Sequence, residues 1–378
     1  MREPIRVAHI MGKMLGGGVE QVVMNYYRHI DRSRVQFDFL VDADSTLVPR
    51  EEIKSLGGRV FEIPPYQHLF AYQRALISLF NEQGWRIVHS HVNALSVFPL
   101  RAAKKAGVPV RIAHSHSTAG KGEHTKNAIK GILRCFSNVY PTYRMACSNH
   151  AGRWLFGANT DFEILHNAID ISSFEFDPDT RRKLRKSLGI ASDALVIGHI
   201  GRFVNQKNHA FLVDVLKAVT ELKKDAVLVL VGDGPLVGEV KAKAKHLNLT
   251  DSVLFLGQRE DASDLYQVFD VFCLPSYYEG LGMVAIEAQA AGLPTICSEF
   301  VPDEALVSSI ASKIYLSDGP TAWAIGVVEA SCAVRYGQTC SIVEAGYDIC
   351  SEAKRLESDY LQLASAHFVF GPSEEMTA

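Results

Sequence analysis

The segment VFCLPSYYEGLGMVAIEAQAAGLPTICS (271–298) contains the repeating unit from which we predict the fold. Its apolar ends, residues 271–275 and 294–298, have the length and composition of buried strands. A glycine-rich turn between them leads into a helical pattern over residues 283–292. A strand, a helix and a second strand in this order predict two parallel strands joined by a crossover helix. Glu287 is the only charged residue of that helix, which by itself fits a buried helix with one wet edge.

The same alternation of strand and helix runs through most of the 378 residues. The predicted strands cover residues 6–11, 37–41, 59–63, 86–91, 110–115, 144–148, 195–201, 226–232, 253–257, 271–275 and 294–298. The predicted helices cover residues 19–30, 71–83, 93–106, 149–156, 208–223, 236–247 and 283–292, and a further helical pattern begins near Ser351. A loop-rich segment near 168–175 separates the two series. We therefore predict an α/β fold with two doubly wound, Rossmann-like domains whose sites lie at the carboxyl ends of the strands.

Composition places the chain among globular proteins, because 47% of the residues are hydrophobic and 21% are charged. The seven cysteines show neither CxxC nor Cys/His ligand spacing, which argues for a reducing compartment and against a zinc site or a disulfide framework. No apolar run approaches the ~18 residues of a membrane-spanning helix, and the N-terminal stretch is too interrupted for a signal peptide. We therefore expect a cytoplasmic protein.

Charge is distributed unevenly. Residues 1–167 carry a net charge of +8, whereas the remainder carries −11. Such a split suggests that the first half meets an anionic partner, although a solvated surface without a partner explains it as well. We expect no nucleic-acid partner.

Several loops that follow strands of the second half carry residues suited to an anionic ligand. In HIGRFVNQKN (199–208), Arg202 and Lys207 provide two cations that can balance a diphosphate. Glycines flank an aspartate in VGDGPL (231–236), and LGQRED (256–261) ends the next strand. Each of these loops, taken alone, is also typical of ordinary loop chemistry.

The turn before the helix at 283–292 offers a second kind of contact. Gly280, Leu281 and Gly282 lead into the helix, whose first N–H groups can bind an anion. Glu279, before the turn, is placed to accept hydrogen bonds from a polyol, and Glu287 can bind the paired hydroxyls of a ribose. One turn can thus hold a sugar, a phosphate and a ribose in sequence.

Two features of the first half complete the set. Gly16, Gly17 and Gly18 follow a strand and open a helix, which allows backbone N–H groups to approach a phosphate or an acceptor, although a tight turn explains them as well. His114 and His116 lie two apart on a strand or its end, so both are expected to point the same way. A structural role for either histidine stays open.

These motifs together resemble the GT-B glycosyltransferases of the large retaining family 4. The pattern E-x7-E, here Glu279-GLGMVAI-Glu287, resembles the family signature. Its companions occur in the family's order: GGGVE, HSH (114–116), ACSNHAGRWLFG (146–157), NAID (167–170), GRFVNQKN (201–208), VGDGP (231–235) and LGQRED. The resemblance covers roughly residues 5 to 300 and weakens towards the helix near 351–366.

The resemblance implies a GT-B fold with two domains that face each other across a cleft. It implies an acceptor-side domain of residues 1–167, to which a helix at about 351–378 returns, and a nucleotide-sugar domain of residues 168–350. It also implies transfer of a sugar from a nucleotide diphosphate sugar, expected to be a UDP-sugar, with retention at the anomeric carbon. The expected acceptor is a saccharide or a lipid-linked saccharide in exopolysaccharide or capsule synthesis.

Residue roles are carried over from the family where the residues match. The predicted catalytic residues are His116, Glu279, Arg202 and Lys207. The predicted donor-binding residues are Gly17, Gly18, Arg202, Lys207, Gly232, Gln258, Arg259, Glu279, Gly280, Leu281, Gly282, Met283 and Glu287. In this assignment the two cations neutralise the diphosphate, Glu279 lies near the sugar, Glu287 binds the ribose, and Gln258 and Arg259 border the nucleobase.

The expected chemistry needs neither a cofactor nor a metal. No Asp-x-Asp motif stands where a metal would bind the diphosphate, so Arg202 and Lys207 are expected to replace it. His116, preferred over His114 because it lies further along the strand, is expected to hold the sugar's 6-hydroxyl or to orient the leaving group. NAID departs from the family, which usually has glycine at the position of Ala168, and we assign no role to residues 299–350.

Two other functions fit part of this pattern. A nucleotide-sugar epimerase of the same fold needs acid/base carboxylates and histidines around the sugar, and the E-x7-E order disfavours it. An inactive, membrane-docked subunit of a transferase complex is disfavoured by the complete diphosphate and sugar motifs.

The segment KGEHTKNAIKGILRCF (121–136) predicts a basic amphipathic helix. Lys126, Lys130 and Arg134 lie four apart, beside an apolar stripe formed by Ile129, Ile132, Leu133 and Phe136. Such a helix can lie on an anionic membrane surface, which would make the protein peripheral on the inner face of the cell membrane. The alternative is a helix that packs its stripe on the sheet and leaves its charges solvated.

Overall fold

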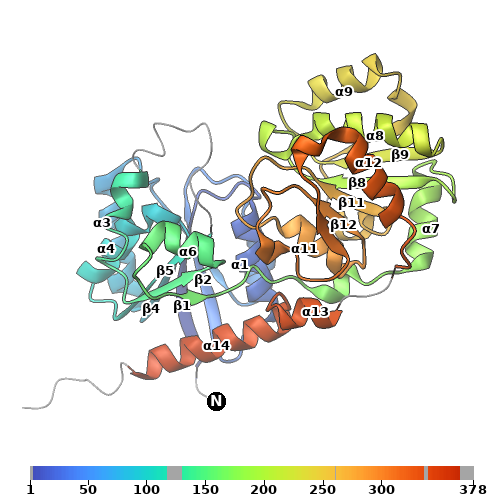
Figure 1. Cartoon of the computed structure of the whole chain (residues 1–378). Coiled ribbons are helices and arrows are strands. Elements are labelled where there is room, and N and C mark those ends of the chain that lie inside the picture. Colours follow the sequence, from blue (N-terminus) through green and yellow to red (C-terminus); the bar gives the residue numbers. More distant parts are fainter. Residues whose placement is uncertain (1–2, 117–129, 260, 336–338, 367–378) are drawn as a thin grey trace, which may run out of the picture. The chain divides into compact units, whose positions relative to one another are not determined.

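The structure, a computed structural model, describes residues 3–116, 130–259, 261–335 and 339–366. The chain forms two compact units, the first made of residues 1–169 and 347–378 and the second of residues 170–346. Each unit contains one parallel sheet with helices on both faces (Figure 1).

The sheet of the first unit has the strand order β3-β2-β1-β4-β5-β6-β7. Its strands are β1 (Ile5–Gly12), β2 (Val35–Asp42), β3 (Arg59–Ile63), β4 (Ile87–Ser90), β5 (Val110–Ser115), β6 (Tyr143–Ala146) and β7 (Glu163–Ile164). Its helices are α1 (Gly18–His29), α2 (Arg50–Ser55), α3 (Leu69–Gln83), α4 (Val97–Lys105), α6 (Asn149–Phe156) and α14 (Ile349–Ala366). A 3₁₀ turn at Asn93–Ser96 precedes α4, so the predicted helix at 93–106 begins as a tighter turn.

Two apolar layers cover this sheet, one on each face. The alternation of side chains along β1 sends Val7 to one face and Ala8 and Ile10 to the other. The first face is covered by α1 and α14, and the second by α3, α4 and α6. The helix predicted from the C-terminal stripe is therefore α14, which packs on α1, with Leu356 and Tyr360 buried.

The sheet of the second unit has the strand order β10-β9-β8-β11-β12-β13. Its strands are β8 (Leu195–Ile200), β9 (Ala226–Val231), β10 (Val253–Gly257), β11 (Val271–Leu274), β12 (Thr295–Cys297) and β13 (Ala311–Lys313). Its helices are α7 (Pro178–Ser187), α8 (His209–Leu222), α9 (Val237–His246), α10 (Ala262–Leu265), α11 (Met283–Ala290), α12 (Gly319–Ala330) and α13 (Thr339–Glu344). The region after residue 298, which received no role, thus supplies the last strand of this sheet and two helices.

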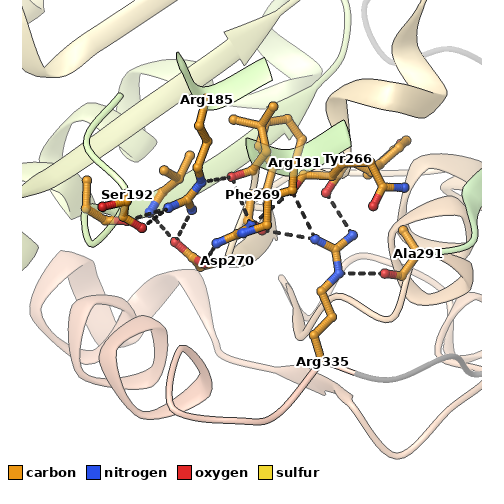
Figure 2. Close-up of polar contacts among 12 residues, drawn as sticks. Arg181, Arg185, Ser192, Tyr266, Phe269, Asp270, Ala291 and Arg335 are labelled. Atoms are coloured by element: carbon orange, nitrogen blue, oxygen red, sulfur yellow. Dashed lines mark hydrogen bonds and ion pairs between the residues drawn. The ribbon is translucent and has the colours of Figure 1, made fainter. Parts of the chain in front are cut away.

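Asp270, the residue before β11, binds two arginines of α7 (Figure 2). Its carboxylate accepts hydrogen bonds from Arg181 and Arg185 and from the backbone N–H of Val196, the last at 2.8 Å. Nearby, the Arg335 guanidinium donates to the carbonyl oxygens of Tyr266, Gln267, Phe269 and Ala291. Burial lowers the pKa of Arg335 to about 9. This cluster lies at the end of the sheet opposite the carboxyl ends of the strands, which leaves those ends for a ligand.

Among the helices of the described residues, none combines the length and apolar character that a bilayer span requires.

Candidate active site

In the second unit, the predicted donor residues follow four strands that neighbour one another in the sheet. The loops after β8, β9, β10 and β11 contain, in that order, Arg202 with Lys207, Gly232, Gln258 with Arg259, and Glu279. Because parallel strands end at the same edge, these loops gather on one side of the unit. The predicted donor residues of the second unit are therefore brought together by the topology of its sheet.

Lys207 and Glu279 form an ion pair between two of these loops. The Lys207 Nζ lies 2.7 Å from the Glu279 Oε1, and the two side chains are only 16% and 7% exposed. Ser276 Oγ donates to the same carboxylate oxygen at 2.6 Å, and Gln206 Nε2 donates to Oε2 at 3.3 Å. The sequence predicted a ligand role for each charge, but it did not predict that they would hold each other.

Backbone contacts fix the same two loops. Gln206 Nε2 donates to the Tyr278 carbonyl at 2.9 Å, and the Gln206 carbonyl accepts from the N–H of Tyr277 at 2.8 Å. Gln206 and Ser276 were not predicted, although both lie within three residues of a predicted site residue. The Lys207–Glu279 pair is thus held from both sides, so the position of the Lys207 ammonium is set before a ligand arrives.

Gly232 allows the loops after β8 and β9 to touch. Its φ is +130°, and a Cβ there would lie 2.2 Å from the carbonyl oxygen of Gly201. The N–H of Phe203 donates to the Asp233 carbonyl at 2.9 Å, which continues the contact. Between these positions Arg202 is exposed, and no residue that the structure describes pairs with its guanidinium. The close packing of backbone therefore leaves an exposed cation in the same loop as Lys207.

The turn before α11 has the geometry expected of an anion-binding helix start. Gly282 caps the helix at a φ of +90°, which disfavours any side chain there, and α11 begins at Met283. Glu287 lies one turn further, where its Oε2 accepts a hydrogen bond from the Tyr266 hydroxyl at 2.7 Å. Burial raises the pKa of Glu287, and the Tyr266 hydrogen bond opposes that rise. Tyr266 was not predicted; it fixes the orientation of the carboxylate.

Gln258 and Arg259 are both exposed after β10. The Arg259 guanidinium is bound to its neighbour Asp261 by two hydrogen bonds, of 2.8 and 2.6 Å. A contact of these residues with a nucleobase stays a prediction.

In the first unit, backbone N–H groups of the glycine-rich loop already donate hydrogen bonds to a side chain of the same chain. The Glu20 carboxylate accepts hydrogen bonds from the N–H groups of Leu15, Gly16 and Gly17, at 2.8, 2.6 and 3.0 Å. A phosphate could use these three groups only if Glu20 moved away. Contacts of Gly17 and Gly18 with a donor or an acceptor therefore stay a prediction.

The two histidines of the HSH stretch point the same way, as the sequence predicted, with ring centroids 3.8 Å apart. His116 follows the end of β5 and is 7% exposed, against 1% for His114. Its backbone N–H donates to Asn93 Oδ1 at 2.7 Å. Burial lowers the pKa of His116 to about 4, so the ring is neutral at pH 7. A neutral ring here can donate or accept a hydrogen bond but adds no charge.

The predicted basic amphipathic helix at 121–136 lies only partly within the described residues. Lys126 and Ile129 of the basic segment lie outside the described residues. Leu133 packs against the core of the first unit, whereas Ile132 and Phe136 are 65% and 47% exposed. The apolar stripe is therefore divided between the core and the surface.

Ala168 stands in NAID where the family usually has glycine. Its φ is negative, and the residue is buried in the core of the first unit. The departure from the family pattern thus requires no strained backbone.

Comparison with known proteins agrees with this arrangement. A family of glycosyl transferase 4-like domains matches residues 17–153, and the family of glycosyl transferases group 1 matches residues 180–307. The putative glycosyltransferase EpsF of Bacillus subtilis is 39% identical over 359 residues, which cover 91% of this chain and 93% of EpsF.

A second relative and a solved structure extend the comparison. An Escherichia coli UDP-Gal:alpha-D-GlcNAc-diphosphoundecaprenol alpha-1,3-galactosyltransferase is 28% identical over 323 residues, covering 81% of this chain and 82% of that protein. The crystal structure of Anabaena HepE in complex with UDP and glucose matches with a TM-score of 0.77 at 18% identity, over 95% of this chain and 99% of HepE. The chain therefore belongs to the group 1 glycosyltransferases, and its two parallel-sheet units have the GT-B architecture.

Proposed function

We propose that this glycosyltransferase moves a sugar from a nucleotide diphosphate sugar, most simply a UDP-sugar, to a saccharide or lipid-linked saccharide in surface polysaccharide synthesis. The Escherichia coli relative supports both parts, because its name specifies a UDP-sugar and a diphosphoundecaprenol-linked acceptor. HepE, solved with UDP and glucose, supports the nucleotide. An epimerase gains no support from these comparisons.

The observation that carries the proposal is the grouping of Arg202, Lys207, Glu279 and Glu287 around the end of one sheet. An unpaired guanidinium, a fixed ammonium and the start of α11 provide positive charge for a diphosphate. The carboxylates of Glu279 and Glu287 provide acceptors for hydroxyl groups. This set of groups suits a donor made of a sugar, a diphosphate and a ribose.

In the proposed reaction, the bond between the anomeric carbon and the diphosphate oxygen breaks. The acceptor hydroxyl oxygen forms its bond to that carbon from the same face, and its proton passes to the departing diphosphate. Negative charge gathers on the departing diphosphate, and Arg202 and Lys207 stabilise it. We propose that these cations make a metal unnecessary at the diphosphate. His116, neutral at pH 7, holds a sugar hydroxyl or orients the leaving group.

We also propose that the first unit docks on an anionic membrane where a lipid-linked acceptor resides. Ile132, Phe136 and Val139 are 65%, 47% and 52% exposed. The half-buried Lys130 and Arg134 belong to the same segment, and the Arg134 guanidinium lies over the Trp154 ring. Apolar side chains next to cations are suited to a headgroup surface. This would place the protein on the cytoplasmic face of the membrane.

Thermal unfolding with a panel of UDP-, GDP- and ADP-sugars tests the donor site. We expect a UDP-sugar to raise the Tm of the purified chain, and slow donor hydrolysis without acceptor to separate an enzyme from an inactive subunit. A chain that no nucleotide sugar stabilises would contradict the proposal.

A further inference from the structure

Five histidines gather on one face of the sheet in the first unit, beneath α1 and α14. They come from β1 (His9), from β4 and the residue after it (His89 and His91), and from β5 and the residue after it (His114 and His116). All five are at most 7% exposed. The corresponding positions along the same strands hold Val7, Ile87 and Ile112, so the histidines interrupt an otherwise apolar face.

Strand pairing explains why the sequence did not reveal this cluster. His9 and His89 are aligned in the parallel pair β1–β4, 80 positions apart in the chain. The cysteines and histidines show no ligand spacing along the chain, so we predicted no metal site from the sequence. Histidines that face one another across neighbouring strands leave no such spacing.

The ring nitrogens of His9, His89 and His91 lie close to one another. His9 Nδ1 lies 2.9 Å from His91 Nε2, and the ligand atoms of His9, His89 and His91 all lie within 4.8 Å of one another. Two imidazole nitrogens bound to one tetrahedral ion, each at about 2.0–2.1 Å, stand roughly 3.3 Å apart. The His9 and His91 rings would therefore need to separate by a few tenths of an ångström, and the His89 ring would need to bring its nitrogen to a similar distance from both.

The surroundings also fit a metal ligand set. The Tyr360 hydroxyl of α14 lies 2.6 Å from His89 Nδ1, the outer hydrogen bond that typically orients a ligating histidine. His9 Nε2 has no hydrogen-bond partner among the described residues.

The imidazole rings of His9, His89 and His91 are in the neutral form at pH 7, which is the form that binds metals. Burial lowers the pKa of His9 to about 3 and holds the pKa of His89 and His91 well below the usual range. A metal would replace two existing hydrogen bonds, the one between His9 Nδ1 and His91 Nε2 at 2.9 Å and the one between His89 Nε2 and His114 Nδ1 at 3.1 Å.

From this geometry we propose that His9, His89 and His91 bind one divalent transition-metal ion, with Zn²⁺ as the expected occupant. Imidazole ligands select Zn²⁺ and Cu²⁺ over Mg²⁺ and Ca²⁺, which prefer oxygen ligands. The ion would join β1 to β4 inside the first unit. Its ligand His91 would lie beside His116, because His91 Nδ1 is 2.9 Å from His116 Nε2.

The test is Zn²⁺ binding to the full chain after removal of metals with a chelator, measured by competition with a chromophoric chelator. We expect about one tight equivalent per chain and a higher Tm in its presence. His9→Gln and His89→Gln should each weaken binding at least a hundredfold. His209→Gln is the matched control, because His209 is also buried but lies in the second unit, and it should bind Zn²⁺ like the wild type.

Co²⁺ added to the metal-free wild type gives a measurement that needs no variant, so it stays valid even if the variants fail to fold. Imidazole ligation predicts visible d–d bands without a thiolate charge-transfer band. A thiolate band would assign the metal to the cysteines and overturn the proposal. So would a wild type that binds no Zn²⁺ equivalent more tightly than His9→Gln, which would leave the histidines as a hydrogen-bonded cluster only.

Discussion

Lys207 Nζ lies 2.7 Å from Glu279 Oε1, so the cation assigned to the donor diphosphate is held by the carboxylate assigned to the donor sugar. The two residues come from loops after neighbouring strands β8 and β11. Their pairing fixes the ammonium at the edge of the sheet and makes the two proposed roles dependent on each other.

Removing either cation should weaken nucleotide binding. Arg202→Ala and Lys207→Ala each remove a charged partner of the diphosphate, worth ~1.5–3 kcal/mol, so UDP affinity should fall at least tenfold in calorimetry. Lys217→Ala is the control, because its side chain is 49% exposed and pairs only at the surface with Glu221. Unchanged affinity in both site variants would refute the diphosphate assignment.

Removing Glu279 should separate binding from turnover. Glu279→Ala frees Lys207 for the diphosphate, so UDP should bind as tightly as to the wild type or more tightly. Turnover should fall about a hundredfold or more, because the carboxylate near the sugar is lost. Steady-state kinetics beside UDP calorimetry measures both quantities. A variant that loses UDP affinity and keeps its kcat would reverse the assignment.

Glu287 should make nucleotide affinity depend on pH. Burial raises its pKa above the usual value, and only the ionised carboxylate accepts hydrogen bonds from both ribose hydroxyls. UDP affinity should therefore be full above the raised pKa and should decline as the pH falls through it. Glu287→Gln should bind UDP more weakly and without this decline. Identical pH profiles for the two proteins would exclude Glu287 from ribose binding.

Two aspartate–arginine ion pairs of equal length should differ in how much they stabilise the fold. Asp270 Oδ2 lies 2.6 Å from the largely buried Arg185, and Asp179 lies 2.6 Å from Arg182 with both side chains more than 60% exposed. Asp270→Ala should cost about 3 kcal/mol of unfolding free energy in urea, because it leaves buried arginines unpaired. Asp179→Ala should cost less than about 1 kcal/mol. Equal costs would show that burial does not decide the strength of these pairs.

Membrane docking should depend on charge and on the exposed apolar residues. The chain should bind anionic vesicles at low salt and detach as salt rises. Charge reversal at Lys126, Lys130 and Arg134, or serine at Ile132 and Phe136, should weaken that binding and leave UDP affinity unchanged. Charge reversal at Lys104 and Lys105, exposed on α4, should change it less. A wild type that ignores anionic vesicles at low salt would point to a soluble acceptor.

The alternation of strands and helices could be predicted because buried parallel strands read as continuous apolar runs. Strands β3, β5 and β10 have the predicted bounds. The short β7 and β13 were missed, since two or three residues carry no period. Helix α7 was missed because its sequence is dominated by charge, and its place depends on Asp270, 85 residues beyond Arg185.

The residue types of the candidate site could be predicted from motifs, but the contacts between them could not. The pairing of Lys207 with Glu279 and the occupation of the glycine-rich loop by Glu20 both depend on how loops close in three dimensions. The histidine cluster depends on strand register in the same way. The spacing of residues along the sequence does not reveal which loops touch or which strands pair in register.

The most direct test of the central claim is the fate of a UDP-sugar incubated with the purified chain and a lipid-diphosphate-linked saccharide. We expect release of UDP, extension of the acceptor by one sugar, and an NMR coupling constant that shows the donor's anomeric configuration in the product. Lys207→Ala should release UDP at least tenfold more slowly. A wild type that instead interconverts the free UDP-sugar, or leaves every tested donor intact, would contradict the proposed sugar transfer.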